Sequence, residues 1–323
     1  MRSPLVAAVI LVAALAACKK SEPRKQAAEP APAPTAAPAA PAATAPDPWA
    51  APAPAPGSMP VIAKPFFYEA TKDGHTLYLL GTMHLGIDAE RQLPTWVLAK
   101  LDGARAFAME TDVSDPSVVK LLIRSDGKKL SDELSPEDWT KLKSVIGDNV
   151  AESMNTMKPF ATLTTVAMKD LPMTSPMDAV LFQRAKAAGK PIVFLEEVSS
   201  QLAAIDPFAT AADVHALLAN LDHSRTQSLQ MVKDYVAGDA AAINAMFEDQ
   251  RLWLAAGRDP ARFGDFVDAT LRVRNQAWIA PLEQLAADGG GFVAVGAAHL
   301  IGPSNVPDLL AARGFSVRRM TAP

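Results

Sequence analysis

Two copies of the same four-residue step could each place a histidine at the end of a β-strand. The steps are Gly81-Thr82-Met83-His84 and Gly296-Ala297-Ala298-His299, and each directly follows an apolar run that predicts a strand, at 77–80 and 292–295. Glycine lets the chain turn sharply where a strand ends. Because open α/β sheets bind ligands outside the carboxyl ends of their strands, the two imidazoles are expected to form one site.

Two further predicted strands lead into acidic residues. The strand over 104–109 leads into Glu110, and the strand over 190–195 leads into Glu196. Imidazole and carboxylate together suit Mn, Fe, Co or Zn. The single cysteine, Cys18, lies near the N-terminus, which excludes a thiolate zinc site or a cysteine nucleophile from the rest of the chain. The four strand ends therefore predict a polar site with two histidines and two glutamates.

Arg274 interrupts an otherwise apolar helical stripe before the second histidine. The stripe begins at Phe263, and its further members are Val267, Leu271, Trp278, Leu282 and Leu285. A charge on a core-facing stripe is costly unless it is paired. Arg274 is therefore expected to reach a carboxylate or a developing oxyanion at the site, with Asn275 beside it. The alternative is an arginine that extends from the rim of the helix to water.

The elements that must position these residues form an α/β pattern. Strands over 66–70 and 76–80 are separated by Lys72-Asp73-Gly74, which predicts a hairpin, and a last strand is expected over 315–320. The region from about 115 to 258 is largely helical, with helices expected over 176–188, 209–222, 225–236 and 239–254. Ser135 is expected to cap another helix. The predicted fold is a central mixed β-sheet with a largely helical middle insertion.

Composition narrows the class of protein. The chain has 323 residues, enough for one large or two small domains, and 20% of them are charged with a net charge of -4. A nucleic-acid-binding domain would need a basic face, so no nucleic-acid partner is expected.

The N-terminal segment has the features of an exported lipoprotein. An apolar run too short to span a bilayer follows Arg2, and it ends in Leu15-Ala16-Ala17-Cys18, which resembles a bacterial lipobox. The sequence predicts a signal peptide over 1–17, a lipidated Cys18, an Ala/Pro-rich disordered tether over 18–60 and a domain over 61–323. A plain cleaved signal that happens to contain a cysteine is the alternative. Lys19 is compatible with sorting of the lipoprotein to the outer membrane.

From about Pro60 to the C-terminus the chain resembles the TraB/GumN family, which includes the Tiki proteases. The motifs that carry the resemblance are the run 77–84, Met109-Glu110-Thr111-Asp112, Leu195-Glu196 with Gln201, Arg274-Asn275 with Trp278, and the run 295–302. The resemblance implies a metallopeptidase with His84, Glu110 and His299 at a metal site, and it favours Mn or Co over Zn. It also implies a fold similar to the haem-binding ChaN and erythromycin esterase group.

The leading hypothesis is a lipid-anchored, periplasmic, metal-dependent hydrolase that acts on a peptide or protein in the envelope. A bound divalent metal would lower the pKa of a water and polarise the scissile carbonyl. Glu110 or Glu196 would act as general base, and Arg274 would stabilise the oxyanion. The competing hypothesis is a non-catalytic lipoprotein that binds haem, a metal or a peptide through the same histidines. A purely structural envelope protein is disfavoured by the polar strand ends.

Overall fold

The computed structural model describes residues 60–112, 114 and 118–323. The predicted signal peptide, Cys18 and all but the last residue of the predicted tether lie outside the described residues. Within the described part of the chain, no single helix has both the length and the apolar composition needed to cross a membrane. The bent pair Val198–Phe208 and Ala211–Ala219 meets both criteria only when its two helices are taken together.

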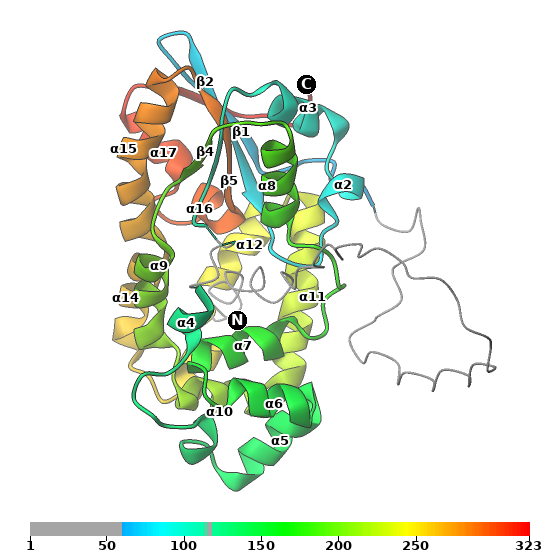
Figure 1. The fold of residues 1–323 in the computed structure, drawn as a ribbon, viewed down its shortest axis with the longest axis vertical. Coiled ribbons are helices and arrows are strands. Elements are labelled where there is room, and N and C mark those ends of the chain that lie inside the picture. The colour runs from blue at the N-terminus through cyan, green and yellow to red at the C-terminus, as the bar shows by residue number, and fades with distance from the viewer. Residues whose placement is uncertain (1–59, 113, 115–117) are drawn as a thin grey trace, which may run out of the picture.

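The described residues form one mixed sheet with the strand order β4-β3-β5-β2-β1-β6 (Figure 1). The strands are β1 Phe67–Lys72, β2 His75–Thr82, β3 Phe107–Met109, β4 Ile192–Phe194, β5 Gly291–Gly296 and β6 Ser316–Arg319. β1 is antiparallel to β2 and β6, whereas β2, β5, β3 and β4 are parallel to one another. The prediction of an α/β fold with a central mixed sheet is confirmed.

The chain enters the sheet through the predicted hairpin. Asp73 and Gly74 both have positive φ, 51° and 80°, which suits the two-residue turn that matches the twist of the paired strands. The register runs from Lys72 opposite His75 to Phe67 opposite Leu80. The Asp-Gly pair therefore determines the start of β2 and, through its register, which residues of β2 face the core.

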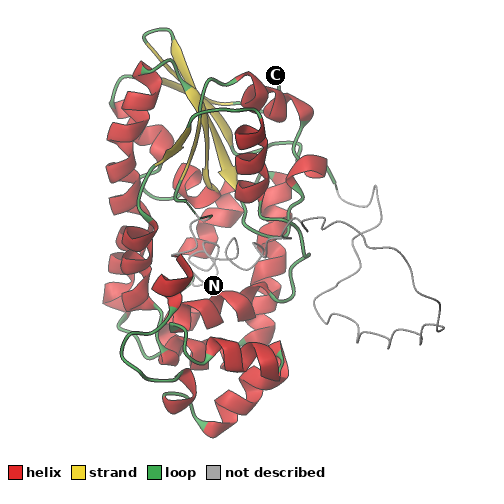
Figure 2. Ribbon diagram, in the orientation of Figure 1, coloured by secondary structure: helices red, strands yellow, loops and turns green. Residues whose placement is uncertain are grey.

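Helices surround the sheet and form the rest of the described chain (Figure 2). The α-helices are α2 Ala89–Gln92, α3 Thr95–Gly103, α4 Val118–Leu122, α5 Pro136–Ile146, α6 Asp148–Met154, α7 Pro159–Met168, α8 Met177–Ala187, α9 Val198–Ile205, α10 Ala211–Ala219, α11 Leu221–Ala237, α12 Ala240–Phe247, α13 Arg251–Ala255, α14 Phe263–Val267, α15 Val273–Ala287, α16 Ala297–Ile301 and α17 Val306–Ala312. Short 3-10 turns occupy Leu130–Asp132, Asp206–Phe208 and Pro260–Arg262, and a π-helical turn occupies Asp268–Arg272.

The helical middle follows the sequence pattern closely, with one correction and one shifted boundary. Ser135 caps α5, as expected, by accepting a hydrogen bond from the amide of Asp138. The helix expected over 239–254 is two helices, α12 and α13, and in the break between them the Asp249 side chain accepts a hydrogen bond from the amide of Arg251. The boundary between α10 and α11 lies at Asn220, earlier than expected, and its side chain donates to the carbonyl of Ala216.

Two hydrophobic clusters support the two halves of the molecule. One surrounds the sheet, and the other lies among α5, α6, α7 and α10 at the opposite end of Figure 1. Helix α11 contacts both clusters, because Met231 and Tyr235 pack with the sheet while Leu229 packs with the helical cluster. The helical half is thereby joined to the sheet half along one continuous helix.

Gly81, at the end of β2, leaves no room for a side chain. A Cβ there would lie 2.9 Å from the Cα of Ala297 and 3.0 Å from the Cβ of Phe66. We expect Gly81→Ala to lower the free energy of unfolding by about 1–3 kcal/mol, because overpacking forces the backbone to shift. Gly264→Ala, in α14 with open space around it, is the control and should be neutral or slightly stabilising. Equal urea midpoints for both variants would contradict the expected crowding.

Candidate functional site

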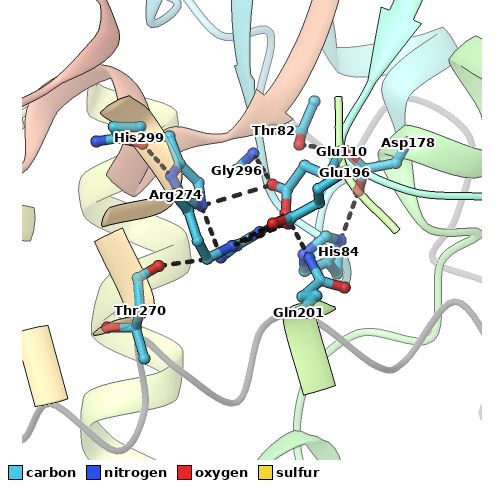
Figure 3. Close-up of polar contacts among 11 residues, drawn as sticks. Thr82, His84, Glu110, Asp178, Glu196, Gln201, Thr270, Arg274, Gly296 and His299 are labelled. Atoms are coloured by element: carbon cyan, nitrogen blue, oxygen red, sulfur yellow. Dashed lines mark hydrogen bonds and ion pairs between the residues drawn. The ribbon is translucent and has the colours of Figure 1, made fainter. Parts of the chain in front are cut away.

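The carboxyl edge of the four parallel strands brings the predicted site residues together (Figure 3). His84 follows β2, Glu110 follows β3, Glu196 follows β4, and His299 lies in α16 just after β5. β2 and β5 are neighbours, with Thr82 opposite Gly296, so the two glycine–histidine steps lie side by side. The side chains are largely removed from water, with 6% exposure for His84 and Glu110 and 3% for His299.

Arg274 lies at the centre of the site, and all five of its N–H groups have partners within the chain. Nε donates to Glu196 at 2.9 Å, and Nη2 donates to Glu110 at 2.7 Å and to Glu196 at 2.5 Å. Nη1 donates to the carbonyl of Thr270 at 3.0 Å and to Nε2 of His299 at 3.2 Å. A guanidinium has five donors and no acceptor. Arg274 therefore pairs with the buried carboxylate of Glu110 and the partly buried one of Glu196 rather than extending to water, and it has no N–H left for another ligand.

The π-helical turn explains how Arg274 reaches this position. Across Asp268–Arg272 the amide of Val273 bonds to the carbonyl of Asp268, five residues earlier, so this turn contains one more residue than an α-helical turn. Val273 follows this turn and is exposed, whereas the next two residues, Arg274 and Asn275, are buried. The spacing of the apolar residues predicted a continuous α-helix here. It gave no sign of the extra residue in the π-helical turn.

Glu110 is held as a carboxylate by donors on both of its oxygens. Oε1 accepts from the amide of Gly296 at 2.7 Å, and Oε2 accepts from Nε2 of Gln201 at 2.8 Å as well as from Arg274. Burial alone would raise the pKa of Glu110, but nearby positive charge from His299, when protonated, and from Arg274 outweighs it and lowers the pKa to about 2. Glu110 is therefore an ionised group and a weak base.

Glu196 lies closer to solvent than Glu110 and depends more on a single partner. Its side chain is 12% exposed and pairs with Arg274. Burial raises the pKa of Glu196 above its usual value, against the opposing effect of Arg274, and the charge of Glu110 acts in the same direction as burial. One guanidinium thus serves two carboxylates that repel each other.

His299 is a neutral imidazole with an assigned tautomer. Because Arg274 can only donate, Nε2 of His299 must accept, so Nδ1 carries the proton and donates to Oδ1 of Asn275 at 2.5 Å. Asn275 is itself oriented by its Nδ2, which donates to the carbonyl of Ser304 at 2.9 Å. Burial is the main reason that the pKa of His299 is lowered to about 3. Asn275 therefore acts on the site through His299.

His84 is paired with Asp178, a residue that the sequence analysis missed. Nδ1 of His84 donates to Oδ2 of Asp178 at 2.5 Å, and the hydroxyl of Thr82 donates to Oδ1 at 2.5 Å. Burial lowers the pKa of His84, but the carboxylate of Asp178 outweighs it and raises the pKa above its usual value. Asp178 lies in the first turn of α8, where an acidic residue is ordinary, so local sequence gave no signal of its role.

A small, partly open pocket of about 60 Å³ borders the site. His84, Glu110, Arg274 and His299 line its polar side. The remaining wall is mainly apolar and comes from several helices, including the side chains of Ile205, Met231, Tyr235, Ile243, Phe266, Val267 and Leu271. His84 belongs to this lining, and its Nε2 is buried without a hydrogen-bond partner in the described chain. This nitrogen is therefore free to meet a ligand or a water.

The predicted metal ligands are brought together but do not fit a metal ion as they are arranged. Imidazole and carboxylate are suitable donors for Mn or Co. However, the described residues include no group of three or more His, Cys, Asp or Glu side chains that could hold a metal ion. Arg274 contacts both Glu110 and His299, so two of the three predicted ligands are already bound to a cation of the chain itself.

The fold and the site define an α/β protein with a buried cluster of histidine, carboxylate and arginine at the carboxyl edge of a mixed sheet. The chain belongs to the TraB/PrgY/gumN family, whose model matches residues 66–319. The resemblance expected from the sequence is thereby confirmed.

Two curated relatives support the family membership. The chain is 26% identical over 247 residues to the protein named "Uncharacterized protein YbaP" of Escherichia coli (strain K12), and the match covers 72% of this chain and 87% of that protein. The same figures hold for the protein of that name from Shigella flexneri. No solved structure matches the chain.

The depressed pKa of Glu110 gives the site an acid-sensitive contribution to stability. A folded pKa of about 2 against an ordinary value of 4.5 means that this contribution is complete above pH 4.5 and is lost as the pH falls toward 2. We expect Glu110→Gln to be less stable than the unmodified chain at neutral pH, with a difference that narrows between pH 4.5 and 2 in urea unfolding. A difference that stays constant over this range would show that the ionised carboxylate does not contribute.

Proposed function

We propose that this protein is a hydrolase that adds water to a carbonyl group of a peptide or protein at the buried site. The observation that carries the proposal is Nε2 of His84, which is buried and unpartnered in the described chain and belongs to a side chain that lines the pocket. A polar atom left without a partner in such a place is costly unless a ligand or water meets it. The proposal assigns that position to the attacking water.

In this proposal His84 is the general base and Asp178 is its positioning residue. Asp178 accepts a hydrogen bond from Nδ1 of His84, which leaves Nε2 to take a proton from a water in the cavity and to return it to the leaving amine or alcohol when the carbonyl bond to that group breaks. A carboxylate in this position orients an imidazole and stabilises its charged form. Glu110 suits the role of base less well, because it is bound by three donors and its pKa is lowered to about 2.

Arg274 would stabilise the negative charge that forms on the substrate oxygen. Its guanidinium borders the same cavity as His84, and such a donor is valuable where water is excluded. Since its N–H groups all have partners, one of them must first leave Thr270 or His299. The proposal therefore requires a shift of Arg274 when substrate enters.

Three further parts of the proposal come from the sequence. They are the peptide or protein substrate, a divalent metal with Mn or Co favoured over Zn, and attachment through Cys18 to the periplasmic face of the envelope, in the outer membrane. Imidazole and carboxylate are suitable metal ligands, but His84, Glu110 and His299 would hold the ion only in a different arrangement, because Arg274 contacts two of them here and Nε2 of His84 cannot bind a metal and act as base at once. When bound, the metal would supply Lewis-acid polarisation of the carbonyl.

The alternative is a protein that binds a ligand and catalyses no reaction. The size of the pocket bears on which ligand that would be. A pocket of about 60 Å³ has room for a few water molecules and, as the helices are arranged here, not for haem. A small ion or the end of a peptide fits the alternative better than haem does.

Hydrolysis of fluorescein-labelled casein and of p-nitrophenyl acetate, with and without added MnCl₂ or CoCl₂, tests the proposed function. We expect turnover by the unmodified chain and a loss of about 10²–10⁴-fold in His84→Gln, the usual contribution of a general base. Asp178→Asn should reduce turnover in the same direction, because His84 loses its ionic partner.

His75→Ala is the matched control, because His75 is an exposed histidine in the hairpin of β1 and β2. It should retain full activity, and circular dichroism should confirm that each variant is folded. Absence of turnover in the unmodified chain under every condition, together with saturable binding of metal or peptide, would favour the binding protein instead.

A further inference from the structure

The apolar wall of the pocket that borders the site has no part in the proposed proton transfer. Its side chains come from helices: Ile205 in α9, Met231 and Tyr235 in α11, Ile243 in α12, Phe266 and Val267 in α14, and Leu271 in the π-helical turn. His84 lines the same pocket from the end of β2. We propose that this wall is a subsite for a short, uncharged, aliphatic acyl group of the substrate.

The polar side chains of the lining leave one atom for a ligand. Its three hydroxyls all donate to other parts of the chain: Tyr235 to the carbonyl of Gly81 at 2.6 Å, Thr270 to the carbonyl of Phe266 at 2.7 Å and Thr82 to Asp178 at 2.5 Å. Its imidazole, carboxylate and guanidinium groups are paired too, except at Nε2 of His84. A ligand that fills this described lining must therefore be apolar over most of its surface.

The charges around the pocket favour a neutral ligand. The carboxylates of Glu110, Asp178 and Glu196 are paired with one guanidinium, that of Arg274, and with His84. Even when His84 is protonated, the cluster has one negative charge in excess, so a carboxylate ligand would be repelled where water is largely excluded. A cation would lose its water and find a single unpartnered side-chain acceptor in the lining, Nε2 of His84. An uncharged acyl group avoids both costs.

The size of the pocket limits the length of the acyl chain. A volume of about 60 Å³ is well below the roughly 150 Å³ of an apolar cavity that accepts benzene, so about two to four carbons fit. Met231 and Tyr235 lie one turn apart on α11 with exposures of 6% and 0%, and Ile243 is 4% exposed. All three belong to the packed cluster around the sheet, which resists compression, so a longer chain cannot push them aside easily.

This inference rests on the proposed function in placing the carbonyl of the acyl group beside His84, where the water attacks. The bond that breaks joins that carbonyl carbon to the leaving nitrogen or oxygen, which receives the proton that His84 took from the water. In a peptide substrate, the subsite takes the side chain of a small aliphatic residue that supplies the carbonyl. Binding of the acyl group itself does not require turnover.

NMR of the full chain with ¹³C-labelled isoleucine methyl groups tests the subsite without any reaction. Ile205 and Ile243 line the pocket, whereas Ile279 is buried to the same extent outside its lining. We expect butyramide to shift the methyl signals of Ile205 and Ile243 saturably and to leave that of Ile279 unchanged. Sodium butyrate, which has the same size but is charged, and hexanamide, which is longer, should bind at least tenfold more weakly.

Ile243→Ala enlarges the subsite. It should tighten hexanamide binding at least tenfold and raise the kcat/KM of p-nitrophenyl hexanoate relative to that of p-nitrophenyl acetate. Ile279→Ala, the same substitution outside the lining, is the matched control and should change neither ratio. If Ile243→Ala fails to fold, Ile243→Val removes a single methylene-sized group and should give a smaller change in the same direction.

Absence of methyl shifts at Ile205 and Ile243 with butyramide would overturn the subsite. Butyrate binding as tight as butyramide binding would overturn its preference for a neutral group, and equal binding of butyramide and hexanamide would overturn its length limit. Saturable shifts without turnover of any ester would leave the subsite standing and remove the proposed hydrolase. Ester turnover that is independent of chain length, without shifts, would do the reverse.

Discussion

The paired charges of Arg274 with Glu110 and Glu196 are the interaction on which the site depends. Removing charges from water costs several kcal/mol per ion, and this cost is offset only when geometry and hydrogen bonding are nearly complete. Here the guanidinium uses all five N–H groups, and Glu110 accepts from three donors. The amide of Gly296 and the side chain of Gln201 complete the cluster, so strand ends and helices must meet accurately around one cation.

The sheet makes this meeting possible. Parallel strands present their carboxyl ends at one edge, and the order β4-β3-β5-β2 places Glu196, Glu110, His299 and His84 along that edge. The helical half then closes the site, since Ile205, Met231 and Phe266 supply apolar cavity wall. Exclusion of water strengthens each polar contact inside and increases the cost of leaving any of them unmade.

Local sequence predicted a large part of this arrangement. Glycine before a histidine at the end of an apolar run has a direct physical meaning, and both such steps lie where they were expected. Arg274 was also identified, because a charge in an apolar stripe demands a partner. Asp178 was missed, since an acid in the first turn of a helix is common. The π-helical turn was missed because a hydrophobic stripe does not report one extra residue.

The sequence by itself determined the elements, their order and the types of side chain at the strand ends, because periodicity, turn residues and capping act over a few residues. Only the tertiary structure decided which groups are paired. His84 pairs with Asp178, which lies in a helix 94 residues later in the sequence. Arg274 pairs with Glu110, which lies 164 residues earlier. Such pairings depend on how the sheet edge and the helices pack, and on which partner best offsets the loss of water around each charge.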